Sequence, residues 1–293
     1  MVKERKPQGP HIVDSEQSEL YKKHTGQKNL LKRLTASSSY LFATKINGSA
    51  SFYSPDKATS LLLDDLKSRS AEFNAMIASL PKEEQGAFIS KDPVQEIKSL
   101  LRKEGIRYSE KKIADALYKH DGYGPKEVSG LLAAYCYILG GLRLPINKPD
   151  DFLTGRSLVH QGLDVPLLDV KDHSSLEELF VVLKKEHLDP FAKIALLHFF
   201  YLHSGLFMGK DERFLYLLLT VLVADSYSSP FGYTLTRHLS TKEKKIDQFY
   251  KTMVKESSKA DLDRFVYSYA KMLSAFLDEE ILALRKNNKP VIN

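Results

Sequence analysis

Four residues that could take part in chemistry lie close together in the sequence, between positions 203 and 213. His203 ends an apolar run, and Gly209, Lys210 and Arg213 follow just before a second apolar run. The first amides of a helix are unpaired and carry a partial positive charge, and a glycine before them lets an anion approach the backbone. With the charges of Lys210 and Arg213, this segment could hold a phosphate group.

Two acidic residues in the same segment leave a second interpretation open. Asp211 and Glu212 would repel an anion, and carboxylates commonly stand at a helix start as partners of its dipole. The segment is therefore predicted either to bind phosphate or to be a solvated helix start.

His203 also has two interpretations. An imidazole with a pKa of about 7 can take a proton from an attacking hydroxyl, which makes His203 a candidate general base. A histidine at the end of a helix can instead balance the unpaired carbonyl groups there. His198, inside the preceding apolar run, is predicted to be a packed core residue.

Two helices are expected to position this segment. Asp189 and Pro190 are a typical helix start, because aspartate caps the first amides and proline fits the first turn. This helix is expected to end at His203, and a second one is expected over 212–225. Both are apolar on all sides, which predicts that they pack together at the centre of the protein.

The rest of the chain predicts an all-α fold. Within residues 57–80, Leu62, Leu66, Phe73 and Ile77 recur at helical spacing, which indicates one amphipathic helix. Further helices are expected within the stretches 92–105, 109–122, 125–141, 174–186, 240–257 and 258–286.

One region departs from this pattern. Residues 140–172 are rich in turn-forming residues and include the β-prone sequence SLVHQ. They predict loops with a small hairpin between 153 and 170.

Composition limits the classes of protein that need be considered. The 293 residues include a single cysteine, Cys136, so an intramolecular disulfide is excluded and a reducing compartment is expected. The N-terminus has no apolar signal region and no segment is long and apolar enough for a membrane span, so a cytoplasmic protein is expected. Residues 1–35 carry eight Lys or Arg against four Asp or Glu and predict a basic arm, without any motif for nucleic-acid binding.

The order of these features resembles that of the Fic (Fido) proteins. An acidic-proline helix start leads to HFFYLH, a loop, an apolar helix and then TLTRHLSTKEKKIDQFYKTM. In that family the loop reads H-x-F-x-[D/E]-G-N-G-R-x-x-R. The resemblance implies a Fic-like helical bundle at 126–285 with a small β-hairpin flap, preceded by an N-terminal helical region at 36–125.

The resemblance also implies a chemistry. Fic domains transfer AMP from a nucleotide to a protein hydroxyl, with the loop histidine as base, so His203 takes that role. With the loop one residue shorter, Gly209, Lys210 and Arg213 take the phosphate-binding positions. ATP is the implied nucleotide. Without that shortening, the acid that holds Mg²⁺ in the family falls on Phe207, and no acid falls there in either alignment, so Mg²⁺ is not supported.

Activity is therefore expected to be weak or lost. The alternative is a catalytically inactive Fic-fold protein that binds a partner or ligand. A protein substrate or protein partner is implied in either case, and a homo-oligomer stays open.

A segment near the N-terminus resembles the inhibitory segment of many Fic proteins, whose pattern is [S/T]-x-x-x-E-[G/N]. At 43–48 this chain has Ala43 in place of the serine or threonine and Asn47 in place of the glutamate. In the family that glutamate pairs with the second loop arginine, which here is Arg213. Its loss predicts that the inhibitory contact is missing.

Overall fold

The structure is a computed structural model with ten described elements. It describes residues 39–103, 105–118, 125–131, 133, 149–160, 173–185, 187–205, 229–256 and 260–287. Along the chain the elements are β1 (Tyr40–Ile46), β2 (Ser49–Tyr53), α3 (Lys57–Ala78), α4 (Lys82–Lys103), α5 (Glu110–Tyr118), α7 (Pro149–His160), α8 (His173–Lys184), α9 (Pro190–His203), α11 (Ser229–Glu256) and α12 (Asp263–Asn287). The predicted all-α fold with a small hairpin is confirmed.

Helix α9 forms the centre of the core. The Asp189 carboxylate caps it by accepting hydrogen bonds from the amides of Phe191 (2.9 Å) and Ala192 (3.2 Å), as the sequence predicts. From Phe191 to Leu202 every residue except Lys193 is buried. Helices α8, α11 and α12 pack around it. The prediction of a central helix is confirmed for 190–203, whereas 212–225 lies outside the described residues.

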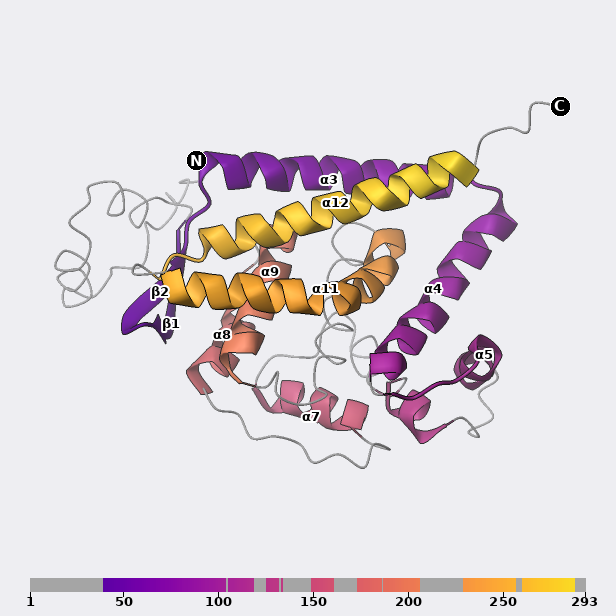
Figure 1. The fold of residues 1–293 in the computed structure, drawn as a ribbon, viewed down its shortest axis with the longest axis horizontal. Helices are drawn as coiled ribbons and strands as arrows, with labels where there is room; N and C mark the ends of the chain where they lie inside the picture. The colour runs from indigo at the N-terminus through magenta and orange to yellow at the C-terminus, as the bar shows by residue number, and fades with distance from the viewer. Residues whose placement is uncertain are drawn as a thin grey trace, which may run out of the picture.

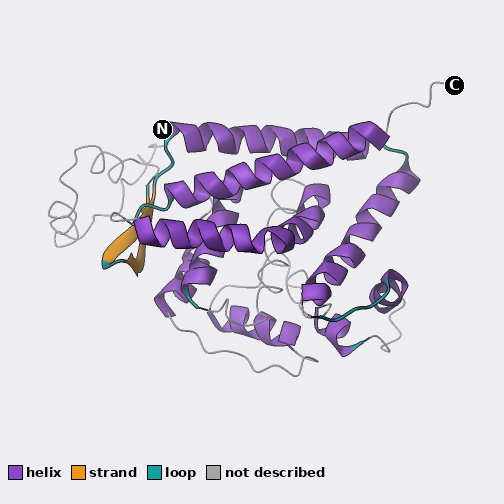
Figure 2. Ribbon diagram, viewed as in Figure 1, coloured by secondary structure: helices purple, strands orange, loops and turns teal. Residues whose placement is uncertain are grey.

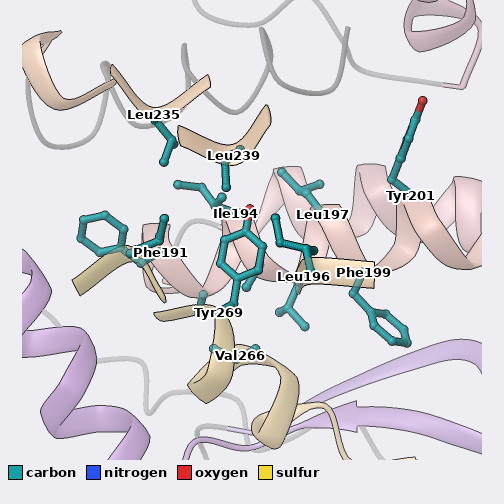
Figure 3. Close-up of a cluster of buried hydrophobic side chains, with 14 of the residues drawn as sticks. Phe191, Ile194, Leu196, Leu197, Phe199, Tyr201, Leu235, Leu239, Val266 and Tyr269 are labelled. Carbon is teal, nitrogen blue, oxygen red and sulfur yellow. The ribbon is translucent and has the colours of Figure 1, made fainter. Parts of the chain in front are cut away.

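Figure 3 shows how this helix is enclosed. Leu235 and Leu239 of α11 lie on one side of α9, and Val266 and Tyr269 of α12 lie on the other. All four side chains are buried. Burial of apolar surface on all sides of α9 is the main source of stability here, at about 25 cal/mol for each Å² removed from water.

Helices α3 and α12 lie side by side, and α11 lies next to α12 (Figure 1). The buried residues of α3 include Leu66, Phe73 and Ile77, so the predicted amphipathic face is confirmed for these three, while Leu62 is only partly buried. Along the outer seam, Arg69 forms an ion pair with Asp278. Among the described residues, no helix has the length and apolar character needed to cross a membrane.

Strands β1 and β2 form an antiparallel hairpin at one edge of the helical body (Figure 2). Asn47 and Gly48 form its turn with φ values of 52° and 82°. Two successive positive φ values are the requirement of the tight turn that Asn-Gly favours between strands. The other edge of β2 is also paired, because Phe52 donates to the Ala260 carbonyl (3.0 Å) and accepts from the Leu262 amide (2.8 Å).

The position of this hairpin corrects the sequence analysis. A hairpin was expected between 153 and 170, but α7 makes 149–160 helical, and 161–172 lies outside the described residues. The proline at the first position of α7 and the two aspartates after it favour a helix start over the short β-prone piece. The strands are instead in the segment that was assigned to a helical region.

Two helices are longer than expected. Helix α4 begins at Lys82 and runs through Pro93, where the sequence suggested a start. Its buried residues Ile97, Leu100 and Leu101 belong to the hydrophobic core, and this burial offsets the hydrogen bond that proline removes. Helix α11 begins at Ser229, before the stretch 240–257 in which it was expected.

Candidate active site

The candidate site begins where α9 ends. The Ser204 amide donates to the Phe200 carbonyl (2.8 Å), and Gly205 follows with φ of 78°. A left-handed residue is a common way to stop a helix, and glycine adopts it without steric cost. His203 is therefore the last helical residue, and it is only partly buried whereas Leu202 and the residues before it lie in the core.

His203 is held by a tyrosine from another helix. Its Nδ1 lies 2.9 Å from the hydroxyl oxygen of Tyr250, in α11. The imidazole also stacks on Phe199, with ring centroids 5.7 Å apart and planes 14° apart. The hydrogen bond and the stacking contact together fix the orientation of the imidazole ring.

The hydrogen bond is compatible with two tautomers of His203. If Nδ1 carries the proton, it donates to the Tyr250 oxygen and leaves Nε2 basic. If Nε2 carries the proton, the Tyr250 hydroxyl donates to Nδ1. Only the first tautomer lets Nε2 accept a proton from a hydroxyl group, so the pair can support general-base chemistry.

A second histidine on the same helix makes a similar contact inside the core. The Nδ1 of His198 lies 3.0 Å from the Tyr269 hydroxyl, and His198 is fully buried. Burial raises the pKa of Tyr269. This confirms the prediction that His198 is a packed core residue.

The segment that resembles an inhibitory segment contacts the same helix as His203. The side-chain amide of Asn47 donates to the Val254 carbonyl oxygen at 2.7 Å, one helical turn after Tyr250. The prediction that the inhibitory contact with Arg213 is missing is not tested, because Arg213 lies outside the described residues. The hairpin turn therefore contacts α11 through a neutral hydrogen bond.

A buried carboxylate fixes the base of this hairpin. The register of β1 and β2 shifts between Leu41 and Lys45. Within that bulge, the amides of Ala43 and Thr44 donate to Glu178 of α8, the second at 3.3 Å. Burial raises the pKa of Glu178, and the two amides lower it in part.

The described residues include two of the predicted site positions, His203 and Asn47. Gly209, Lys210 and Arg213 lie outside the described residues, so their positions relative to His203 stay predictions. In the part of the chain that is described, no cluster of three or more histidine, cysteine or acidic side chains is arranged to hold a metal ion.

Sequence reasoning missed two residues that shape the site. Tyr250 follows the buried Ile246 and precedes the buried Met253 at helical spacing. The sequence therefore predicts that Tyr250 lies on the buried face of its helix, but it does not predict which residue Tyr250 contacts. Glu178 stands beside the exposed Glu177, and this acidic pair is typical of a solvated face. No local signal indicates which of the two carboxylates is buried.

Comparison with known proteins supports the fold. No protein-family model matches the sequence, and no curated protein matches it. The structure is similar to the crystal structure of a Fic family protein from Desulfovibrio desulfuricans G20, with a TM-score of 0.53 and 14% sequence identity over 79% of this chain and 76% of that one. The chain therefore has a Fic-like fold, as the sequence resemblance implied.

Proposed function

We propose that this chain is a divergent Fic-fold nucleotidyltransferase that slowly transfers AMP from ATP to a hydroxyl group of a protein. The observation that carries the proposal is the placement of His203 at the end of α9, partly exposed and held by Tyr250 at 2.9 Å. That position matches the loop histidine of the family in the sequence resemblance.

His203 acts as the general base in this proposal. The oxygen of the target hydroxyl attacks the α-phosphorus of ATP while Nε2 of His203 takes the proton. The bond from the α-phosphorus to the bridging oxygen breaks, and pyrophosphate leaves. Tyr250 accepts a hydrogen bond from Nδ1 and so keeps the tautomer that Nε2 needs.

The phosphates of ATP are assigned to the segment after α9. Gly209, Lys210 and Arg213 occupy the family's phosphate-binding positions in the shortened alignment. ATP with Mg²⁺ supplies an activated phosphoryl group in such reactions. Without that shortening the metal position falls on Phe207, and no acid falls at this position in either alignment, so no step is assigned to a metal ion, and a low rate follows.

One observation favours a second candidate function. Met208 stands where the shortened alignment requires the family's asparagine, in addition to the missing acid. A protein that has lost both groups could use the same fold to bind a nucleotide or a protein partner without catalysis. This second function predicts ligand binding that does not depend on His203.

Mass spectrometry of proteins incubated with the chain and ATP distinguishes these functions. A transferase adds AMP to a serine, threonine or tyrosine hydroxyl, and His203→Ala reduces the rate by about 10²- to 10⁴-fold, which is the usual contribution of a general base. His187→Ala is the matched control, because His187 is exposed in the turn before α9. Absence of any adduct, with ATP binding intact, would support the inactive protein instead.

The phosphate-binding residues have their own test. Lys210→Ala and Arg213→Ala should each weaken ATP binding by roughly 1–3 kcal/mol, the usual range for a hydrogen bond from a charged group. Lys82→Ala, at an exposed position of α4, serves as the control. ATP affinity that does not respond to either substitution would remove this segment from both functions.

A further inference from the structure

A cavity of about 410 Å³ lies at the junction of α4 and α5. Among the described residues it is lined by Arg102, Arg107 and Tyr108. Figure 1 shows α5 beside the C-terminal end of α4, away from the hairpin. His203 is not among the described residues that line the cavity.

The end of α4 brings the two arginines together. Gly105 has φ of 74°, its amide donates to the Arg102 carbonyl (3.0 Å), and the Ile106 amide donates to the Leu101 carbonyl (3.0 Å). This pair of hydrogen bonds is the Schellman motif, which reverses the chain directly after a helix. Arg107 is therefore returned toward the last turn of α4, where Arg102 lies.

Tyr108 is held in place by two neighbours. Its hydroxyl donates to the Glu127 carboxylate at 3.2 Å. The ammonium group of Lys112 lies over its ring, 4.2 Å from the centroid. Burial and the charge of Glu127 raise the pKa of Tyr108, so the hydroxyl stays protonated at neutral pH.

The charge at this junction is positive. Arg102 and Arg107 are both exposed, and neither forms an ion pair with a carboxylate of the described residues. The nearby Glu110 is neutralised by Lys98 at 2.5 Å. Among the described residues, no carboxylate pairs with either of the two guanidinium groups that line the cavity.

We propose that this cavity binds a small organic phosphate monoester. A guanidinium group offers parallel N–H donors that match two phosphate oxygens. Two such groups suit a phosphate dianion better than they suit a ligand with a single carboxylate. The cavity is larger than an inorganic phosphate needs and falls within the usual size of small-molecule sites, about 300–1,000 Å³. The ring of Tyr108 provides an apolar wall for the organic part.

Isothermal titration calorimetry of the full chain with phenyl phosphate tests the proposal. Arg102→Ala and Arg107→Ala should each weaken binding by about 10-fold or more. Arg285→Ala is the matched control, because Arg285 is an exposed arginine already paired with Glu72 at 2.5 Å. Equal effects of all three substitutions, or no measurable binding of phenyl phosphate, would overturn the proposal.

Further arms of the experiment identify the ligand class. Inorganic phosphate should bind more weakly than phenyl phosphate, and benzoate more weakly still, whereas equal affinity for benzoate would overturn the preference for a phosphate. Arg102→Lys and Arg107→Lys retain the charge but lose the paired donors, so they should recover only part of the affinity. Circular dichroism of each variant checks that the fold is intact.

Variants of the other site separate the two proposals. Lys210→Ala and Arg213→Ala should leave unchanged the part of phenyl phosphate binding that is lost in Arg102→Ala and Arg107→Ala. A loss of binding in those variants, with Arg102→Ala without effect, would place the probe near the candidate active site and overturn this inference. Neither result depends on whether the chain transfers AMP.

Discussion

Two histidines on α9 make nearly the same hydrogen bond in different surroundings. His198 contacts Tyr269 at 3.0 Å and His203 contacts Tyr250 at 2.9 Å, each through Nδ1. His198 is fully buried in the middle of the helix, whereas His203 stands at its end and is partly exposed.

The comparison shows that the hydrogen bond alone does not identify a catalytic residue. A buried histidine with a buried tyrosine satisfies two polar groups within the core, and burial raises the pKa of the tyrosine. A histidine at a helix end can exchange protons with a ligand, and its tyrosine then sets the tautomer. The position of His203 at the end of the helix, and not its hydrogen bond to a tyrosine, distinguishes this candidate base from His198.

The largest expected difference is in stability. His198→Ala removes a buried ring and one hydrogen bond, so we expect the free energy of unfolding to fall by about 2–4 kcal/mol. His203→Ala should cost less than about 1 kcal/mol, because part of the ring is already in contact with solvent. Urea denaturation measures both, and equal losses would contradict the distinction between a core and a site histidine.

Substitutions of the two tyrosines test the same comparison between His198 and His203, with a smaller expected effect on stability. Tyr269→Phe should lower the free energy of unfolding by about 1–2 kcal/mol, since it removes the hydroxyl that pairs with His198 in the core. Tyr250→Phe should change stability by at most about 0.5 kcal/mol. Its expected effect is on His203, whose two ring nitrogens should lose their fixed tautomer.

Nitrogen-15 chemical shifts of the His203 ring measure that loss. In the native chain Nδ1 should have the shift of a protonated nitrogen and Nε2 that of an unprotonated one. In Tyr250→Phe the two shifts should move toward each other. Native shifts with Nε2 protonated would contradict the general-base proposal while leaving the stability comparison intact.

Local signals in the sequence account for much of this arrangement. Asp189 and Pro190 predict the start of α9. The apolar residues on all sides of this helix predict that it lies at the centre of the core. The Asn47–Gly48 pair is also a strong hairpin signal, although 43–48 falls within the region 36–125 for which helices are expected. Local turn chemistry was the better guide at that position.

The partners of the site could not be predicted in the same way. Tyr250 is 47 residues from His203 along the chain, and Glu178 is 135 residues from Ala43. Contacts over such separations depend on how helices pack, and a single sequence records helix faces without recording which faces meet.

The hairpin turn offers a further test of the surroundings of His203. Asn47→Glu loses the side-chain donor to the Val254 carbonyl and places a less suitable residue at φ of 52°, so we expect a stability loss of about 1–2 kcal/mol. If the glutamate pairs with Arg213 as in the family, nucleotide binding should also weaken. Nucleotide affinity measured by calorimetry tests this regulatory contact.

Asn47→Asp is the matched control, because aspartate tolerates the left-handed conformation but is too short to match the family's glutamate and lacks the donor. It should lose stability without weakening nucleotide binding. Unchanged nucleotide affinity in Asn47→Glu would show that the segment has no regulatory role.

The smallest expected effect concerns Glu178 and pH. Its pKa is raised above the ordinary value of 4.5, mainly by burial, so the folded state binds this proton more strongly than the unfolded state does. Its contribution to stability is complete below pH 4.5 and is lost as the pH rises through the raised pKa. Glu178→Gln should remove that loss while its amide oxygen still accepts from Ala43 and Thr44.

Thermal unfolding at a series of pH values measures this effect. The curve for Glu178→Gln should be flatter above pH 4.5 than that of the native chain. Glu177→Gln, at the exposed neighbouring position, should leave the shape of the curve unchanged. Identical curves for native chain and Glu178→Gln would mean that the carboxylate is solvated.

The pairing of β2 with residues 260–262 has a consequence for synthesis of the chain. Phe52 leaves the ribosome long before Ala260 and Leu262, with a delay of roughly 10–40 s at about 5–20 residues per second. During that interval one edge of the hairpin has no native partner, and an open strand edge is a template for aggregation. A nascent chain that stops before α12 should therefore depend on chaperones that cover strand edges, whereas the completed chain covers this edge itself.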